Sequence, residues 1–419
     1  MILKQITAQQ LPSIRREAFD QATLEQSRTI VDDVRDGGAD AVRRYAEQFG
    51  DIEGGQALVV EQDELEAALA ELGDEKRGVL ERTARRIREF ATAQRESLTD
   101  LEIPIPGGVA GHRVIPVESA GCYAPGGRFP LPSSVLMTAV TARAAGVKNV
   151  WVASPKPTVE TLAAAAIAGV DGMLRVGGAQ AIAAMAYGVG GAPPCDAICG
   201  PGNRWVTAAK QIVSSVTRID MLAGPSELVV LADEAADAAT VAADLLAQAE
   251  HDTDALPILV TTSKDLASRV DQELSLQLAD LPTADTARVA LENGFTVVVD
   301  DMDQAIEVCN RIAPEHLEVL TEDARDVADR LYNFGGLFVG ENAAEVLGDY
   351  GAGPNHTLPT GGTARSQAGL SVFNFLKVAT WMRIDDGSAA QELVEDAVAL
   401  GRMEGLEAHA RSAAKRREE

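Results

Sequence analysis

Residues 312–318 read IAPEHLE and place a carboxylate and an imidazole side by side, directly after a proline. A neutral imidazole is a good proton acceptor near physiological pH, because its unperturbed pKa is about 6.5. Pro314 should end the preceding helix and fix the backbone just before the pair. Glu315 and His316 are therefore candidates for acid–base catalysis. The alternative is an exposed polar pair at the start of a strand.

Other histidines and carboxylates have the types and spacing of metal ligands. Gln248 and His251 lie three residues apart near the end of a predicted helix, so they share one face of it. Asp349 and His356 fall in a loop rich in glycine and proline, and loops often carry functional residues. Nitrogen and oxygen donors without a thiolate suit Zn²⁺, and would also accept Mn²⁺ or Co²⁺. Any one of these histidines could instead be an ordinary surface residue.

The C-terminal segment EGLEAH adds Glu404 and His409. Five residues apart on a straight helix, their side chains would point about 140° away from each other. One site could use both only if the helix is broken, for example at Gly405, or if they reach different parts of a cavity.

Three glycine-bearing turns, at 123–134, 176–188 and 200–203, could bind a nucleotide, although no G-x-G-x-x-G follows a strand. Gly177 and Gly178 lie between a predicted strand and a helix, where free backbone N–H groups would favour a phosphate. Each turn alone is consistent with plain turn chemistry. All three follow strands of one predicted domain, at the edge where open sheets bind ligands.

Short apolar strands alternate with helices in two parts of the chain, at about 148–203 and 227–340. This alternation predicts an α/β fold with two Rossmann-like parallel-sheet domains that lack the G-x-G-x-x-G fingerprint. A helical N-terminal segment precedes them, and a mostly helical C-terminal tail follows. The two similar halves could reflect an old duplication.

The predicted boundaries follow from these shifts in pattern. The expected parts are an N-terminal arm (1–18), a first α/β domain with the catalytic and metal residues (19–122 plus 226–368), a second α/β domain with the cofactor turns (123–225) and a helical tail (369–419).

Composition excludes several classes of function. A formal net charge of -26 would repel phosphate backbones, so nucleic acid is not an expected partner. The N-terminus does not resemble a signal peptide, and no apolar run approaches the ~20 residues needed to cross a bilayer, so we expect a cytoplasmic protein without a membrane partner. The four cysteines form no C-x-x-C motif and are expected to be buried.

Eight segments occur in an order that resembles the histidinol dehydrogenase family, from about residue 20 to 415. They are GCYAPGG…PSSVLM, RVGGAQAIAAMAYG, GPGN, IDMLAGPSELVVLAD, QAEHD, APEHLE, GDYGAGPNHTLPTGGTARS and EGLEAH.

The resemblance implies roles for individual residues. One zinc ion per subunit would be held by Gln248, His251, Asp349 and His409. The substrate would be held by these four residues together with Ser226, Glu315, His356 and Glu404. Glu315 and His316 would carry out the catalysis. NAD would be contacted by Tyr123, Gln180 and Asn203, one from each glycine turn.

The resemblance also implies an intertwined, domain-swapped homodimer in which the tail of one subunit completes the site of the other. The expected reaction converts L-histidinol to L-histidine through L-histidinaldehyde, using two NAD and one water. His316 would take the O–H proton as hydride leaves carbon, and Glu315 would activate water for the second oxidation.

Other interpretations remain open at this point. Related zinc and NAD enzymes share most of these motifs but oxidise other small alcohols, such as a sulfonated diol. A metal-dependent hydrolase could use the same donor residues and would not bind a nicotinamide. A catalytically silent homologue would be expected to have lost Glu315 or His316, and the sequence retains both.

Overall fold

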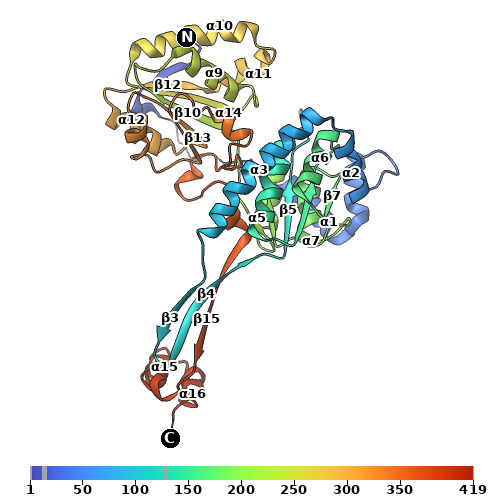
Figure 1. Cartoon of the computed structure of the whole chain (residues 1–419), viewed down its shortest axis with the longest axis vertical. Helices are drawn as coiled ribbons and strands as arrows, with labels where there is room; N and C mark the ends of the chain where they lie inside the picture. The colour runs from blue at the N-terminus through green and yellow to red at the C-terminus, as the bar shows by residue number, and fades with distance from the viewer. Residues whose placement is uncertain (1, 12–16, 127–129, 419) are drawn as a thin grey trace.

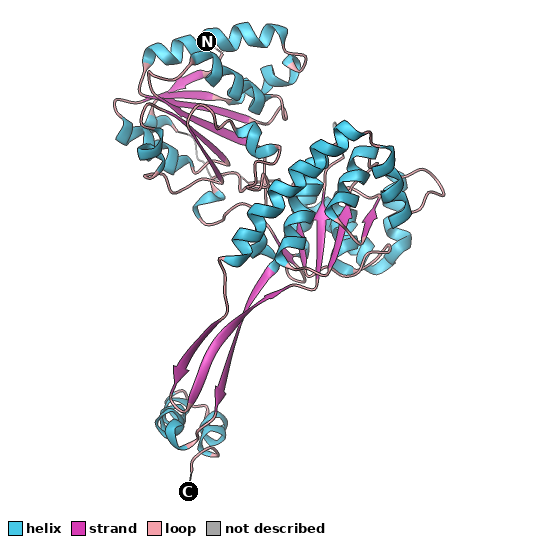
Figure 2. Cartoon of the chain, viewed as in Figure 1, coloured by secondary structure: helices cyan, strands magenta, loops and turns pink. Residues whose placement is uncertain are grey.

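The computed structural model describes residues 2–11, 17–126 and 130–418. The chain forms two α/β domains and a long arm that projects away from both (Figure 1). Helices cover the sheets of the two domains, whereas the arm is an antiparallel ribbon with two helices at its tip (Figure 2).

The β5 domain is built on a six-stranded sheet in the order β2-β7-β6-β5-β8-β9, parallel except for β2. Its strands are β2 (Val59–Val60), β5 (Ser119–Tyr123), β6 (Asn149–Ala153), β7 (Gly172–Leu174), β8 (Ala197–Cys199) and β9 (Arg218–Ile219). Its helices are α1 (Gln21–Gln48), α2 (Gln62–Glu71), α3 (Asp74–Glu96), α4 (Pro132–Val135), α5 (Thr141–Ala145), α6 (Val159–Ala168), α7 (Gly178–Tyr187) and α8 (Arg204–Val213). A π-helical turn, η2 (Leu136–Val140), joins α4 to α5.

The β10 domain has a second six-stranded sheet, entirely parallel, in the order β1-β12-β11-β10-β13-β14. Its strands are β1 (Lys4–Ile6), β10 (Glu227–Ala232), β11 (Leu256–Thr261), β12 (Phe295–Val298), β13 (His316–Leu320) and β14 (Gly336–Val339). One face packs on α9 (Ala238–Ala249), α10 (Lys264–Asp280) and α11 (Ala284–Asn293), and the other on α12 (Met302–Ile312) and α13 (Ala324–Ala328).

The arm consists of β3 (Leu101–Ile105), β4 (Gly108–Pro116) and β15 (Leu376–Ile384), capped by α15 (Gln391–Met403) and α16 (Glu407–Ala414). The prediction of a mostly helical tail is wrong for 376–384, which pair with β4 along their whole length. Pairing with a strand some 260 positions earlier in the chain decides this conformation, and a local helical pattern cannot reveal it.

The helices between residues 21 and 96 belong to the β5 domain, which differs from the grouping of 19–122 with 226–368. Val31, Val34 and Val42 of α1 are buried in one core with Ile182 of α7, and α2 packs on α6. Conversely, β1, which lies within the predicted N-terminal arm, is an edge strand of the β10 sheet. Periodicity identified these elements, but it carries no information about which sheet they cover.

The predicted alternation of strands and helices in 148–203 and 227–340 is confirmed. The five strands β5 to β9 are ordered in their sheet as β10 to β14 are in theirs, and each sheet gains an earlier strand at one edge. This shared order is consistent with the duplication hypothesis. The four cysteines are free and buried, as predicted. Among the described residues, no helix has the length and apolar character that a membrane span requires.

Candidate active site

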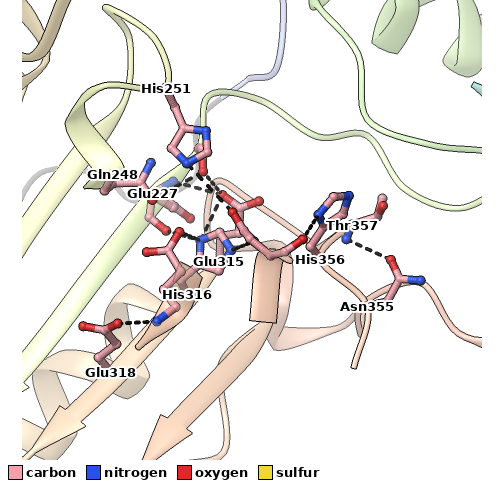
Figure 3. A network of polar contacts seen from close by, with 12 residues as sticks. Glu227, Gln248, His251, Glu315, His316, Glu318, Asn355, His356 and Thr357 are labelled. Carbon is pink, nitrogen blue, oxygen red and sulfur yellow. Dashed lines mark hydrogen bonds and ion pairs between the residues drawn. The ribbon is translucent and has the colours of Figure 1, made fainter. Parts of the chain in front are cut away.

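The predicted catalytic pair lies where β10 and β13 begin, side by side at the amino edge of the β10 sheet (Figure 3). Helix α12 ends at Ile312, and Ala313 takes a left-handed conformation (φ 53°) directly before Pro314. This conformation is uncommon for a residue with a side chain and turns the chain sharply into β13. Glu315 is 7% exposed and His316 is 3% exposed. The alternative of a solvent-exposed pair is therefore wrong.

The carboxylate of Glu315 is held by two donors. Its Oε2 accepts hydrogen bonds from Ser226 Oγ at 2.7 Å and from the backbone N–H of Glu227 at 3.0 Å. Burial raises the pKa of Glu315 well above its ordinary value, and the two hydrogen bonds oppose that shift. A carboxylate with a raised pKa is a stronger base near neutral pH, which suits the activation of water.

His316 has one ring nitrogen occupied and one free. Its Nδ1 lies 3.2 Å from the backbone carbonyl of Glu227, which can only accept, so Nδ1 carries the proton. Nε2 is buried and has no hydrogen-bond partner in the described part of the chain. Burial lowers the pKa of His316 to about 3, so the ring is neutral at physiological pH. The free lone pair on Nε2 is a candidate proton acceptor.

A group of three side chains beside this pair could hold a metal ion. One donor atom each from His251, Glu345 and Asp349 lies within 4.8 Å of the other two. Asp349 closes helix α14 (Glu345–Asp349), and its Oδ2 is 3.9 Å from His251 Nε2. Burial raises the pKa of Asp349 to about 7, because a carboxylate taken out of water is harder to ionise.

Gln248 adds a further donor at the end of α9. Its side chain is buried, Nε2 has no partner among the described residues, and Oε1 lies 3.5 Å from Ser226 Oγ. Oxygen and nitrogen of an amide are interchangeable by a flip, so either position can present a carbonyl oxygen to a cation. An unpartnered buried amide beside a His and carboxylate set fits an N/O metal site of the zinc type.

Two buried glutamates were missed from the sequence. Glu345 lies with Oε1 3.4 Å from His316 Nδ1, and neither of its carboxyl oxygens has a hydrogen bond to another described residue. Glu318 accepts a hydrogen bond from the backbone N–H of Glu345 at 2.6 Å. The i, i+4 spacing of Glu345 and Asp349 was a usable signal, because it places both carboxylates on one face of a short helix.

His356 connects the cluster to the other domain. Its Nδ1 lies 3.0 Å from the carbonyl of Asp349, and its Nε2 lies 3.4 Å from Ser134 Oγ in α4 of the β5 domain. The neighbouring Asn355 donates to the carbonyl of Met137, in the π-helical turn, at 2.7 Å. A cavity of about 510 Å³ reaches Asp349 and His356 from this side.

The tail residues do not join the cluster within one chain. Glu404 closes α15 and His409 lies in α16, both at the far end of the arm (Figure 1). Gly405, with φ 74°, separates the two helices, so the break predicted at this position is present. Both side chains are exposed.

The three predicted cofactor residues lie together in the β5 domain, apart from the catalytic pair. Tyr123, Gln180 and Asn203 line one pocket of about 550 Å³, a size typical of small-molecule sites. They stand at the carboxyl edge of the sheet: Tyr123 ends β5, while Gln180 and Asn203 follow β7 and β8. Gly200 (φ 119°) is required in the turn after β8, because a Cβ there would lie 2.0 Å from the carbonyl oxygen of Tyr123.

The expectation of free N–H groups at Gly177 and Gly178 is wrong. The backbone N–H of Gly177 donates to the carboxylate of Asp51 at 2.9 Å, and that of Gly178 donates to the hydroxyl of Tyr123 at 3.1 Å. The sequence did not single out Asp51, which lies more than 120 positions earlier. A phosphate bound to these two N–H groups would have to displace both partners.

A two-domain α/β fold, with a buried acid–base pair in one domain and a nucleotide-sized pocket in the other, is the architecture of a dinucleotide-dependent oxidoreductase. Comparison with known proteins agrees. The family model for histidinol dehydrogenase matches residues 14–417. Histidinol dehydrogenases from Thermus thermophilus and Methanosarcina mazei are 45% and 44% identical, over 94% and 91% of this chain and 95% and 89% of their own lengths.

A solved structure is similar as well. The crystal structure of histidinol dehydrogenase from Elizabethkingia anophelis superposes with a TM-score of 0.91 at 32% identity, covering 99% of this chain and 98% of that one. The chain therefore belongs to the histidinol dehydrogenase family and is an oxidoreductase.

Proposed function

We propose that the chain oxidises L-histidinol to L-histidine through L-histidinaldehyde, with zinc bound and with two NAD as hydride acceptors. The observation that carries the proposal is the buried pair of Glu315 and His316, with a free imidazole Nε2 beside a nitrogen and oxygen donor set, in a member of this family. The similar curated proteins that align over most of this chain are histidinol dehydrogenases. This favours L-histidinol over a sulfonated diol as the substrate.

His316 takes the hydroxyl proton in each oxidation. Its Nδ1–H is directed at the carbonyl of Glu227, and this contact keeps the lone pair on Nε2 available. The carbonyl also stabilises the imidazolium that forms when Nε2 accepts the proton.

Glu315 activates the water that hydrates the aldehyde before the second oxidation. Ser226 and the backbone of Glu227 fix its Oε2, which leaves Oε1 as the oxygen that can accept a proton from water. Burial strengthens this base by raising its pKa.

The zinc ligands in this proposal are Gln248, His251, Asp349 and, from a second copy of the chain, His409. When bound, the zinc would coordinate the substrate's imidazole and amine and so orient the reacting carbon, a contribution of proximity worth several kcal/mol. Glu404, on the same tail as His409, supplies a carboxylate that can accept a hydrogen bond from the N–H of this amine.

The role of a second copy is supported by the arm. A three-stranded ribbon with two helices buries little apolar surface, and large side chains on it remain exposed, including Val378, Met382, Leu400 and Met403. Such a surface is typical of an obligate interface. An intertwined homodimer would cover it and bring the tail residues of each chain to the cluster of the other.

The first experiment follows NADH absorbance with L-histidinol, NAD and zinc. The proposal predicts about two NADH per L-histidinol consumed, with L-histidine as product. Release of a hydrolysis product without NADH would favour the metal-dependent hydrolase, and no turnover with L-histidinol would reject the proposal.

A complementation experiment tests the shared site. His316→Ala and His409→Ala chains are each expected to be inactive, or nearly so, as homodimers. Unfolded and refolded together, the two variants should regain activity. One site in each mixed dimer then has an intact His316 from one chain and an intact His409 from the other. No recovery, with mixed dimers verified by mass spectrometry, would show that the tail does not act on a partner.

A further inference from the structure

Asp51 is the one acidic side chain among the described residues that line the pocket of the β5 domain. It follows α1 in a tight turn, where its backbone N–H donates to the carbonyl of Ala46 at 2.7 Å. The pocket walls near it are mostly apolar or aromatic, with Ile30, Phe49 and Trp205 among them. A carboxylate in such a setting requires an explanation, because removing it from water is costly.

Half of the Asp51 carboxylate is fixed by the protein. Its Oδ2 accepts from the backbone N–H of Gly177 at 2.9 Å and from Nε2 of Gln180 at 3.1 Å. These contacts place it at the N-terminus of the ten-residue helix α7, which favours a negative charge. The other oxygen, Oδ1, accepts no hydrogen bond from any described residue. The pocket therefore offers one oriented, unused anionic acceptor.

The half of the dinucleotide that reaches this pocket follows from where the catalytic pair lies. The nicotinamide must approach His316, which is in the β10 domain. None of the residues that line the β5-domain pocket belongs to the catalytic cluster. The pocket is therefore left for the adenosine half, whose ribose bears free 2′- and 3′-hydroxyls in NAD and a 2′-phosphate in NADP.

We propose that Asp51 selects NAD over NADP by accepting hydrogen bonds from the adenosine ribose hydroxyls through Oδ1 and by repelling a 2′-phosphate. The inference rests on the proposed NAD-linked function and adds a specificity-determining residue to it. An acidic side chain that binds a ribose 2′-hydroxyl is a general device of nucleotide-binding sheets. Here it would come from the turn after α1, a helix that packs on α7 and α8.

Two cations lie near the pocket without lining it: Lys156, and Arg204, whose guanidinium carbon lies 4.3 Å from the ring centroid of Trp205. Lys156 is the cation whose charge acts on Asp51, but it is not among the residues that line the pocket. Its ammonium lies beside Gly50, on the chain just before Asp51. A 2′-phosphate placed at Oδ1 would lie directly beside the carboxylate. Contact between two negative charges is electrostatically unfavourable.

The test compares kcat/KM for NAD and for NADP, with L-histidinol and zinc, in the wild type and in Asp51→Asn. Asparagine keeps an oxygen for Gly177 and Gln180, removes the charge and turns an N–H₂ group towards the pocket. The wild type should prefer NAD strongly, and Asp51→Asn should lower the NAD-to-NADP ratio by at least about tenfold, mainly through a lower KM for NADP. Asp51→Glu keeps the charge and should still discriminate against NADP.

The matched control is Glu53→Gln, which removes the same charge two residues away from an exposed side chain that does not line the pocket. It should leave the ratio unchanged. Equal use of NAD and NADP by the wild type, or an unchanged ratio in Asp51→Asn, would overturn the inference while leaving the NAD-linked function standing.

A calorimetric titration with NAD and NADP, without substrate, separates the two proposals further. If L-histidinol yields no NADH, the proposed function fails. A lower dissociation constant for NAD than for NADP, and the loss of this difference in Asp51→Asn, would still support the role of Asp51. Equal dissociation constants for NAD and NADP in both proteins would reject it.

Discussion

The β5 and β10 domains share one strand order but place their functional residues at opposite edges. In the β5 domain, Tyr123, Gln180 and Asn203 stand at the carboxyl edge, where α7 and α8 begin. In the β10 domain, Glu315 and His316 stand at the amino edge, close to where α9 and α12 end. Helix N-termini favour anions and C-termini favour cations.

This difference explains the chemistry each domain can support. The amino edge of the β10 sheet gathers carboxylates and histidines around the carbonyl ends of helices, a suitable setting for a metal ion and a cationic substrate. The carboxyl edge of the β5 sheet offers helix N-termini, but Asp51 and Tyr123 occupy the N–H groups of Gly177 and Gly178 where α7 begins. A shared topology therefore does not fix the edge at which a site forms, and the helix ends and a few side chains at that edge set its charge preference.

The largest expected effect comes from removing the base at the amino edge. His316→Ala should lower kcat by about 10³-fold or more, because general base catalysis contributes on that order. NAD binding in the β5 domain, measured by calorimetry, should stay unchanged. Zinc content, measured by atomic absorption, should also be retained. Loss of NAD binding in this variant would contradict the separation of the two edges.

Glu315→Gln tests whether Glu315 and His316 have separate roles at the amino edge, with Glu315 activating water and His316 accepting the hydroxyl proton. The amide keeps the size of the side chain but cannot activate water, so the second oxidation should slow by about 10²-fold while the first persists. Carbonyl trapping should reveal accumulated aldehyde, and NADH per L-histidinol should fall towards one. If both oxidations slow equally, Glu315 does not act specifically on water.

A third effect concerns stability and the metal. Asp349, Glu345 and His251 bring their donor atoms within 4.8 Å, so a bound cation should relieve the crowding of buried carboxyl groups. Adding zinc at about 100 times its dissociation constant should stabilise the metal-free protein by about 2.7 kcal/mol, visible as a higher Tm. His251→Ala should remove most of this increase, whereas His112→Ala, at a half-buried position on β4, should not.

The sequence predicted the strands and helices of 148–203 and 227–340 because each has a strong local pattern, but not the edge strands β1, β2 and β9. It also identified His251, Asp349, Glu315 and His316, whose neighbours in the chain carry the motif. It missed Asp51, Glu345 and the arm strand β15, and it assigned α1 to α3 to the other domain. Glu345 could have been found from its i, i+4 spacing to Asp349. Each of the others depends on a contact between distant segments, such as Asp51 with Gly177 or β15 with β4, and no local pattern records such a contact.

The smallest expected effect tests the carboxyl edge of the β5 domain. Tyr123→Phe removes the hydroxyl that accepts from the N–H of Gly178 and leaves that donor without a protein partner inside a pocket wall. The free energy of unfolding should fall by about 1 kcal/mol, measured by urea denaturation. The KM for NAD should rise a few-fold without a change in zinc content, because the metal-binding edge belongs to the other sheet. A loss of zinc in this variant would mean that the two edges are coupled, and the independence inferred from their positions would be wrong.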